Sequence, residues 1–339
     1  MQYLAPRRLA SFAKRFAGRN LANAYLQRHT QHLFGDRTLK RKPNDCITIA
    51  VVRDCEDYID TFIRHYLKLG VAHIVLMDNG SEDDTVSRAA QHKNVTAISC
   101  KLPYKKFKDE MRQFLADRYS LNRWCITADC DEFLDYPHSA KVSLEQLIRY
   151  CENHGYQAVL TQMLDMYPAC EIGTQIEPAD FRKEHRWFEV DSIKKEIIPA
   201  GLENTVGNAD LRLHYGGVRQ RVFQVSPLIS KFALIKPSFD LKPVGHHLIS
   251  RAKIADISAV LYHYKFISSF SKTVARAVQE KQYYQGSAEY EKYHQSLNSE
   301  TPLKLLDDSS IELTDISQLL KLNFIRLSNG YENYARSVS

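Results

Sequence analysis

The sequence contains no run of eighteen or more apolar residues, which excludes an ordinary membrane-spanning helix. It has no C-x-x-C pair, and its seven cysteines are odd in number and lie mostly in apolar stretches, so reduced thiols are expected. No uninterrupted apolar segment typical of a secretory signal stands near the first residue, because basic residues interrupt it: Arg7, Arg8, Lys14, Arg15 and Arg19. These absences predict a cytoplasmic protein.

The composition is that of a folded, water-soluble chain. The 339 residues are 44% hydrophobic and 25% charged, with a mean hydropathy of −0.39, which excludes disorder over most of the length. This length predicts one large domain with additions, or two ordinary domains. No internal repeat or low-complexity segment is present.

The positive charge is concentrated near the N-terminus. Residues 1–42 contain ten Lys or Arg and one acid, so the remaining residues carry a net charge of −3 out of the total of +6. A core that binds nucleic acid is therefore not expected. Leu9, Phe12 and Phe16 recur at helical spacing with the basic residues mostly on the other face, a pattern that suits attachment of residues 1–42 to an anionic membrane surface. The alternative is a solvated helix packed on the main domain, or a partly disordered arm.

Strand-like and helix-like segments alternate after residue 45. Parallel strands joined by helices give this pattern, which predicts a three-layer α/β domain with a mainly parallel sheet. The Tyr58–Leu69 helix is expected to end at Gly70, and Ser81 with Asp84 resembles a capping box before the next helix. The expected segments are strands Cys46–Val52, Val71–Met77, Val95–Cys100 and Trp124–Ala128, helices Tyr58–Leu69, Thr85–Gln91 and Asp109–Tyr119, and a basic loop at Lys105, Lys106 and Lys108.

The most specific local motif is a D-x-D sequence, Asp129-Cys130-Asp131, directly after an apolar strand. Two carboxylates at the end of a strand can hold one Mn²⁺ or Mg²⁺ and leave coordination positions for a diphosphate. Asp54 and Asp78 follow two other predicted strands, and ligands of open α/β sheets bind at the carboxyl ends of the strands. A solvated turn is the ordinary explanation of an isolated D-x-D, and the surrounding topology favours the metal site.

Further short motifs accompany the D-x-D sequence between Ile47 and Ser328. They are Val51–Asp54, Tyr66–Val71, Asp78–Thr85, Ala128–Phe133, Met163–Pro168, Tyr215–Arg219, the region of Lys231 and Leu261–Phe266. Together these segments resemble the family-two-type glycosyltransferases. The resemblance implies a GT-A fold, a nucleotide-sugar donor, a divalent metal ion on the D-x-D motif and inversion at the anomeric carbon. The chain departs from the family at Asp54-Cys55, where Asn-Glu is common, and at Asp83-Asp84, where Asp-Gly is usual.

The resemblance also assigns roles near the donor. Asp131 is expected to bind the metal ion directly, with Asp129 on the ribose or a metal-bound water and His263 completing the metal site. Asp78 is expected to contact the uracil or ribose, or alternatively to cap a helix. A hydrogen-bonded core histidine is the alternative for His263.

Inversion requires a base for the acceptor hydroxyl. Asp165 is the first candidate because it ends the apolar run from Ala158, and Asp191 and Glu189 compete with it. Four tyrosines could stack on sugar faces or simply pack, and three basic residues are expected to offset phosphate charge. These are Tyr283, Tyr284, Tyr290 and Tyr293, and Arg219, Arg221 and Lys231.

The domain prediction has three parts. Residues 1–44 form a basic extension, residues 45–268 form the glycosyltransferase domain, and residues 269–339 form a C-terminal helical region. Within the domain, residues 45–150 are the donor half and residues 151–268 the acceptor half, which includes a loop-rich stretch over residues 180–225.

The function predicted from these features is metal-dependent sugar transfer, by preference from a UDP-sugar, to a saccharide or lipid-linked acceptor of cell-surface polysaccharide or glycolipid synthesis. One alternative is a nucleotidyltransferase, but a glycine-rich loop after the first strand would favour it and Arg53–Asp57 has no glycine. The other alternative is a noncatalytic module that keeps the fold and binds a membrane or a partner.

Overall fold

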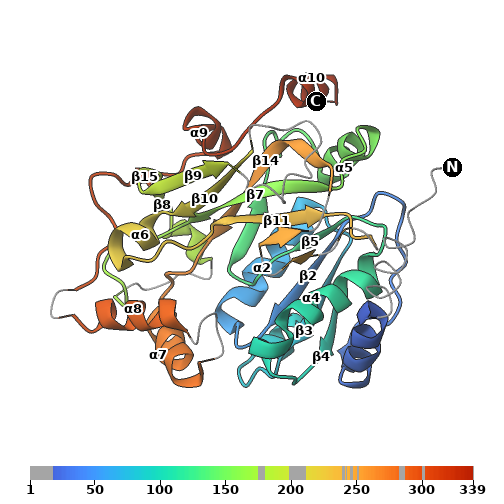
Figure 1. Cartoon of the computed structure of the whole chain (residues 1–339), viewed down its shortest axis with the longest axis horizontal. Coiled ribbons are helices and arrows are strands. Elements are labelled where there is room, and N and C mark those ends of the chain that lie inside the picture. Colours follow the sequence, from blue (N-terminus) through green and yellow to red (C-terminus); the bar gives the residue numbers. More distant parts are fainter. Residues whose placement is uncertain are drawn as a thin grey trace, which may run out of the picture.

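The computed structural model describes residues 18–174, 180–197, 211–238, 241, 243–244, 247–249, 252–281, 287–299 and 302–338. Its centre is a nine-stranded sheet in the order β1-β4-β3-β2-β5-β11-β7-β14-β6 (Figure 1). The strands are β1 (Gln31–Phe34), β2 (Ile47–Val52), β3 (His73–Asp78), β4 (Val95–Ser99), β5 (Cys125–Thr127), β6 (Glu132–Asp135), β7 (Ala158–Asp165), β11 (Ser230–Ile235) and β14 (Ile254–His263).

Most strands of this sheet share one direction. The β2, β3, β4, β5, β7 and β14 strands run parallel to one another, and β1, β6 and β11 run antiparallel to them. Every residue of β2, β3, β7 and β11 is buried, as expected for apolar strands that are covered on both faces. The predicted α/β class with a mainly parallel sheet is confirmed.

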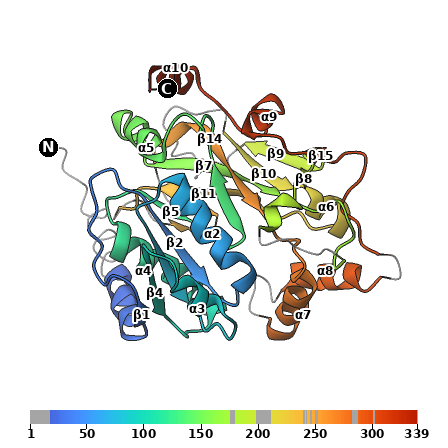
Figure 2. The same ribbon diagram turned by 180° about the vertical axis from the view of Figure 1, so that it is seen from behind.

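Helices cover both faces of the sheet. On one face, α2 (Glu56–Leu69), α5 (Leu144–Asn153) and α10 (Asn329–Val338) pack against a large apolar cluster (Figure 2). On the other face, α4 (Tyr104–Ser120) and the helical residues 18–28 pack against a second cluster. The α2 helix points Ile59, Phe62 and Tyr66 at the sheet and ends at Gly70, whose φ of 105° suits a residue without a Cβ. This end is as predicted.

Two local predictions are wrong. The basic segment is not a loop, because α4 begins at Tyr104 after Pro103, and its first turns contain Lys105, Lys106 and Lys108. The expected capping box before α3 (Thr85–Ala89) is absent, because the Ser81 hydroxyl accepts a hydrogen bond from the Asp54 backbone N–H. The Thr85 N–H is instead taken by the carboxylate of Asp83.

The described part of the N-terminal segment packs on the domain. The β1 strand pairs with β4, Arg19 forms an ion pair with Asp117 on α4, and Arg41 donates to the carbonyl oxygens of Tyr119 and Trp124. The predicted division at residue 44 therefore does not coincide with the edge of the sheet. The amphipathic positions Leu9, Phe12 and Phe16 lie outside the described residues. No helix in the described ranges is both long and apolar enough to cross a membrane.

The second half of the chain adds smaller elements around the sheet. An aromatic cluster of Phe223, Phe266, Phe270 and Tyr293 joins α6 (Val218–Phe223), α7 (Phe270–Glu280) and α8 (Ala288–Leu297). The remaining elements are η1 (Phe181–Lys183), β8 (Trp187–Phe188), β9 (Ile193–Ile197), β10 (Arg212–Gly216), β12 (Pro243–Val244), β13 (Leu248–Ile249), β15 (Ile311–Glu312) and α9 (Ile316–Lys321). Because β15 pairs with β8, the C-terminal region returns to the main domain and is not purely helical.

Candidate functional site

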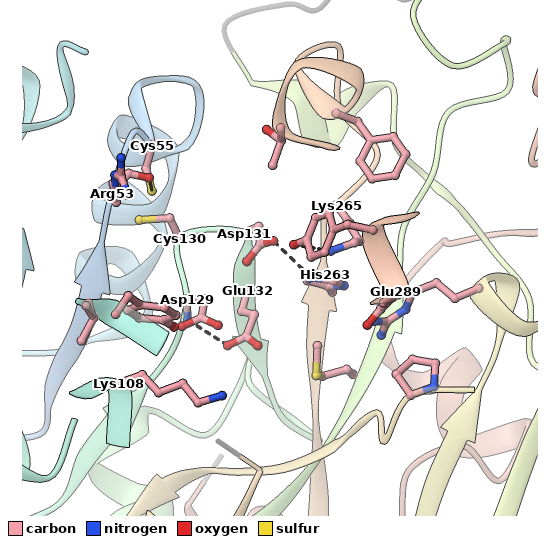
Figure 3. Close-up of a pocket in the computed structure, with 18 of the residues that line it drawn as sticks. Arg53, Cys55, Lys108, Asp129, Cys130, Asp131, Glu132, His263, Lys265 and Glu289 are labelled. Atoms are coloured by element: carbon pink, nitrogen blue, oxygen red, sulfur yellow. Dashed lines mark hydrogen bonds and ion pairs between the residues drawn. The ribbon is translucent and has the colours of Figure 1, made fainter. Parts of the chain in front are cut away.

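A pocket of about 1130 Å³ opens at the carboxyl ends of β2 and β5. The D-x-D loop and residues 53–55 line one side of the pocket, residues 224–228 and α8 line the other, and α7 joins the two sides through ion pairs with Arg53 and Asp54. Figure 3 shows Asp129 and Asp131 on one side of this space, with Lys265 and Glu289 on the other. The pocket thus joins the predicted donor half to elements from the end of the chain.

The D-x-D loop is held from behind by a buried glutamate. Glu132 begins β6, and its Oε2 accepts hydrogen bonds from the Asp129 backbone N–H at 2.9 Å and from Lys231 Nζ at 2.6 Å. The Tyr264 N–H donates to the Asp131 carbonyl oxygen at 2.9 Å. Lys231 was predicted to bind phosphate, but its side chain is 3% exposed and does not line the pocket. Its role in this structure is to neutralise Glu132.

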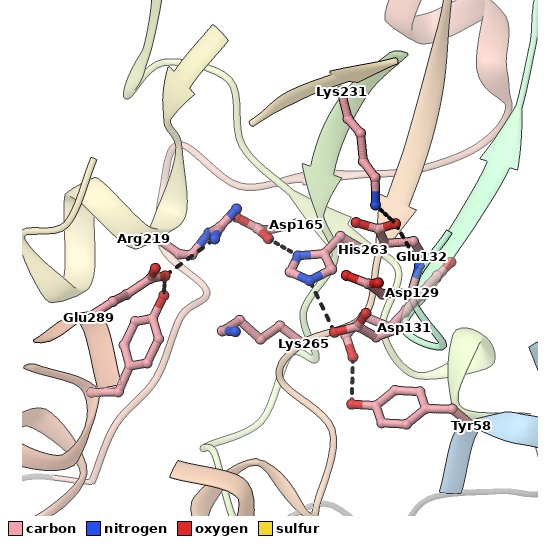
Figure 4. A network of polar contacts seen from close by, with 12 residues as sticks. Tyr58, Asp129, Asp131, Glu132, Asp165, Arg219, Lys231, His263, Lys265 and Glu289 are labelled. Carbon is pink, nitrogen blue, oxygen red and sulfur yellow. Dashed lines mark hydrogen bonds and ion pairs between the residues drawn. The ribbon is translucent and has the colours of Figure 1, made fainter. Parts of the chain in front are cut away.

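Three titratable side chains, those of Asp131, His263 and Asp165, contact one another in series across the ends of β7 and β14. The strands pair in parallel with His263 beside Asp165, so His263 Nδ1 lies 2.5 Å from Asp165 Oδ1 (Figure 4). The other ring nitrogen, Nε2, lies 3.1 Å from Asp131 Oδ2. Burial lowers the pKa of His263, but Asp131 and Asp165 outweigh burial and raise it to about 9. In turn, His263 counters the effect of burial on Asp131 and lowers the pKa of that carboxyl.

The residues fit a divalent ion that is bound partly by its substrate. Asp131 would offer a carboxylate oxygen, and His263 would offer Nε2 once the ion displaces its proton, while Asp165 behind the ring fixes its orientation, as is usual for metal-binding histidines. The third predicted ligand, Asp129, accepts a hydrogen bond from Arg112 at 3.2 Å. Among the described residues no three His, Cys, Asp or Glu side chains form a complete ion site. Mg²⁺ and similar ions commonly take only one or two carboxylates plus phosphate oxygens.

The structure argues against Asp165 as the catalytic base. Its two oxygens bind His263 and Arg219 Nε, the latter at 2.8 Å, and it does not line the pocket. Burial raises its pKa, but Arg219 and His263 outweigh this and lower the pKa to about 2, which leaves a weak base. Asp191 is exposed away from the pocket, and Glu189 is buried outside it. Sequence reasoning missed that Asp165 is enclosed by partners distant in sequence.

The other strand-end carboxylates have different surroundings. Asp54 lines the pocket in a left-handed conformation with a φ of 50°, and it forms an ion pair with Arg276 on α7. Asp78 does not line the pocket, because its two oxygens accept the backbone N–H groups of Gly80 and Ser81 at 3.1 and 3.0 Å. These N–H groups belong to the turn after β3, and the N-cap residue of α3 is Asp84, so Asp78 neither caps that helix nor lines the pocket where a nucleoside contact was predicted.

The basic residues predicted to bind phosphate separate into two groups. Arg219 lines the pocket and links Asp165 to Glu289, with Nη1 of the guanidinium 3.3 Å from Glu289 Oε1. Arg221 lies outside the pocket and binds Asp307 and the Leu305 carbonyl oxygen. This arrangement anchors α6 to the segment before β15.

Sequence reasoning did not single out four polar residues of the pocket region. Arg112 binds Asp129, Arg276 binds Asp54, Glu289 binds Arg219, and Lys265 lies 4.8 Å from the centre of the Tyr290 ring. Lys265 lies two residues after His263 in the segment Leu261–Phe266 that resembles the family, so the sequence could have indicated it as a site residue. The others are isolated charges on helices, and no local pattern marks them. Tyr290 lines the pocket and Tyr293 packs in the aromatic cluster, whereas Tyr283 and Tyr284 lie outside the described residues.

No protein-family model matches the chain, and no curated protein matches it. Among solved structures it is similar to S. aureus TarS, with a TM-score of 0.35 and 13% identity over 73% of this chain and 41% of that one. It is also similar to 4-diphosphocytidyl-2C-methyl-D-erythritol synthase, with a TM-score of 0.26 and 10% identity over 85% of this chain and 99% of that one. The chain spans about two fifths of the length of TarS. Statements about function therefore rest on the pocket itself.

Proposed function

We propose that this protein is a metal-dependent, inverting glycosyltransferase that uses a nucleotide-sugar donor, by preference a UDP-sugar. The observation that carries the proposal is the contact between Asp131 of the D-x-D loop and His263, in a pocket at the carboxyl ends of parallel strands. Ligands of open α/β sheets bind at this edge. The pocket volume of about 1130 Å³ lies slightly above the range of about 300–1,000 Å³ typical of small-molecule sites, which supports a ligand as large as a nucleotide sugar.

The residues of the loop have separate roles in this proposal. Asp131 and His263 would hold Mn²⁺ or Mg²⁺, and such an ion would offset the negative charge of the departing diphosphate. Asp129, which Arg112 holds, would contact the ribose or a water on the ion. Asp54 and the cations that line the same pocket, Arg53, Lys108 and Arg276, would contact the nucleoside and the phosphates.

The acceptor is proposed to be a saccharide or a glycolipid at the cytoplasmic face of a membrane. The charge of the N-terminal segment supports an anionic surface, because each basic residue near anionic lipid contributes about 1 kcal/mol. All seven cysteines lie within the described residues and are free, in keeping with a reducing compartment. Nucleic acid is not proposed as a partner.

The donor site can be tested by thermal unfolding of the purified protein. We expect UDP, GDP, CMP or one of the UDP-sugars to raise Tm with Mn²⁺ present and much less without it. A ligand at 100 times its Kd adds about 2.7 kcal/mol to the free energy of unfolding, which is readily measured. Asp131→Ala should abolish the metal-dependent shift, because it removes one of the two contacts to the ion.

Asp308→Ala is the matched control, since Asp308 is exposed and lies outside the pocket. It should keep the nucleotide shift of the wild-type protein. If no nucleotide or nucleotide sugar shifts Tm with Mn²⁺ or Mg²⁺ present, the donor-site assignment is wrong and the noncatalytic alternative gains support. Sedimentation with anionic vesicles would then decide whether the basic segment alone confers a function.

A further inference from the structure

The wall of the pocket opposite the D-x-D loop carries a carboxylate with an available oxygen. Glu289 lies in the first turn of α8 and lines the pocket with a side chain that is 34% exposed. Its Oε1 accepts hydrogen bonds from Arg219 Nη1 and from the Tyr293 hydroxyl. No hydrogen bond to its Oε2 occurs within the described part of the chain, so this oxygen is available to a ligand.

A buried hydrogen-bond donor lies beside this carboxylate. Arg219 has a side chain that is 6% exposed, and its Nη2 is buried without a partner among the residues that the structure describes. The same guanidinium uses Nε and Nη1 on Asp165 and Glu289. An orphaned buried N–H group is costly, so a ligand oxygen that reaches Nη2 would be stabilised by completing its hydrogen bonds. A donor and an acceptor at one place are what a hydroxyl group needs, since it accepts one hydrogen bond and donates another.

Most of the other carboxylates that line the pocket already bind side chains or backbone groups of the protein. Asp131 faces His263, and Asp129 is bound by Arg112 on the donor side. Glu132 is 1% exposed against Lys231.

Two further carboxylates, Asp54 and Glu280, form ion pairs with Arg276 and Arg53. Asp109 lies on α4, on the donor side of the pocket. Glu289 is therefore the carboxylate on the wall that faces the donor site, and Figure 4 shows it across from Asp131 with Lys265 between them.

We propose that Glu289 is the catalytic base for a saccharide hydroxyl, an assignment that rests on the proposed function. The hydroxyl oxygen attacks the anomeric carbon of the donor, the bond from that carbon to the diphosphate oxygen breaks, and the hydroxyl proton passes to Glu289 Oε2. Nη2 of Arg219 donates a hydrogen bond to the same acceptor sugar. Burial raises the pKa of Glu289, but Arg219 and Lys265 outweigh burial and lower it, so the side chain carries no proton at neutral pH. Unlike Asp165, Glu289 lines the pocket and has a carboxylate oxygen that accepts no hydrogen bond from the described residues, so the assignment rests on this geometry.

The test measures the release of UDP from UDP-glucose, UDP-galactose and UDP-N-acetylglucosamine. Each donor is combined with glucose, galactose or N-acetylglucosamine as the acceptor, and with water as the only acceptor. Glu289→Gln keeps the size of the side chain and removes the base. We expect kcat to fall by about 10²–10⁴. The KM for the donor and the Tm shift with UDP and Mn²⁺ should stay as in the wild-type protein, because Glu289 does not contact the D-x-D loop.

Two further variants separate chemistry from structure. Formate should restore part of the activity of Glu289→Ala, because it supplies a carboxylate in the vacated space, and a purely structural role would not respond in this way. Glu291→Gln on the same helix, exposed and outside the pocket, should keep wild-type activity.

The possible failures are distinguishable. A Glu289→Gln enzyme that binds UDP and retains more than a tenth of wild-type kcat would overturn the assignment of the base alone. Wild-type protein that releases no UDP from any of the three donors, and whose Tm no nucleotide or nucleotide sugar shifts, would overturn the proposed function together with it.

Discussion

At the scale of single residues, the D-x-D loop depends on a buried ion pair. Glu132 and Lys231 are 1% and 3% exposed at their side chains, and burial raises the pKa of Glu132 in spite of the lysine. Lys231→Met would leave a buried carboxylate without its counter-charge. We expect the free energy of unfolding in urea to fall by about 3–5 kcal/mol.

A second substitution tests the reason for this loss. In the Lys231→Met background, Glu132→Gln should recover part of the stability, because a neutral amide needs no counter-charge and can still accept the Asp129 N–H. A loss below about 1 kcal/mol in the single variant would contradict the view that the pair is strongly coupled.

Roles of single residues were predictable only where a local motif marks them. The D-x-D sequence was recognisable because it follows an apolar strand, and β5 does end at Thr127, directly before the loop. Asp165 also follows an apolar strand, but its partners His263 and Arg219 are 98 and 54 residues away in sequence. Contacts at such separations convert an expected base into a carboxylate that orients a histidine, and no local pattern reports them.

At the scale of elements, α2 is fixed to its neighbours by a histidine that the fold keeps neutral. His65 Nε2 donates to the Leu134 carbonyl oxygen on β6 at 2.9 Å, and Nδ1 accepts from Arg182 Nη1 at 3.3 Å. A proton on Nδ1 would remove the second contact. Burial, helped by the charge of Arg182, lowers the pKa of His65 to about 4.

This lowered pKa makes stability depend on pH. Below pH 6.5 the unfolded chain binds a proton at His65 that the folded chain does not bind, so stability falls as the pH falls toward about 4. The contribution is at most about 1.4 kcal/mol per pH unit. His65→Gln should flatten the plot of unfolding free energy against pH between 6 and 4.5, whereas the exposed His29→Gln should not. Identical slopes for the wild type and His65→Gln would refute this account.

Helices and strands were predictable where burial makes apolar residues recur at a regular spacing. Strands covered on both faces read as continuous apolar runs, and α2 repeats its apolar positions every three or four residues, so both were found. The start of α4 was missed because lysines dominate its first turns, although Tyr104, Phe107 and Met111 follow the helical spacing and pack against the second cluster. The two-residue strands β8 and β15 were missed because each is defined by pairing with the other across the chain.

At the scale of the whole molecule, the pocket exists because the C-terminal elements return to the first half of the sheet. Arg53 after β2 forms two hydrogen bonds with Glu280 on α7, at 3.2 and 3.1 Å, and Arg276 on the same helix forms an ion pair with Asp54. The sequence could predict the sheet edge but not this wall, because the identity of the covering helix depends on long-range pairing of surface charges.

These two pairs should hold α7 against the donor side of the pocket. Each is partly exposed, so the double variant Arg53→Ala/Arg276→Ala should lose only about 0.5–2 kcal/mol of global stability. Local opening depends on the few contacts of one element, so amide hydrogen exchange over Phe270–Glu280 should rise much more than exchange in α5. Exchange in α7 that matches the wild type would show that the aromatic cluster of Phe223, Phe266 and Tyr293 is sufficient to hold the helix in place.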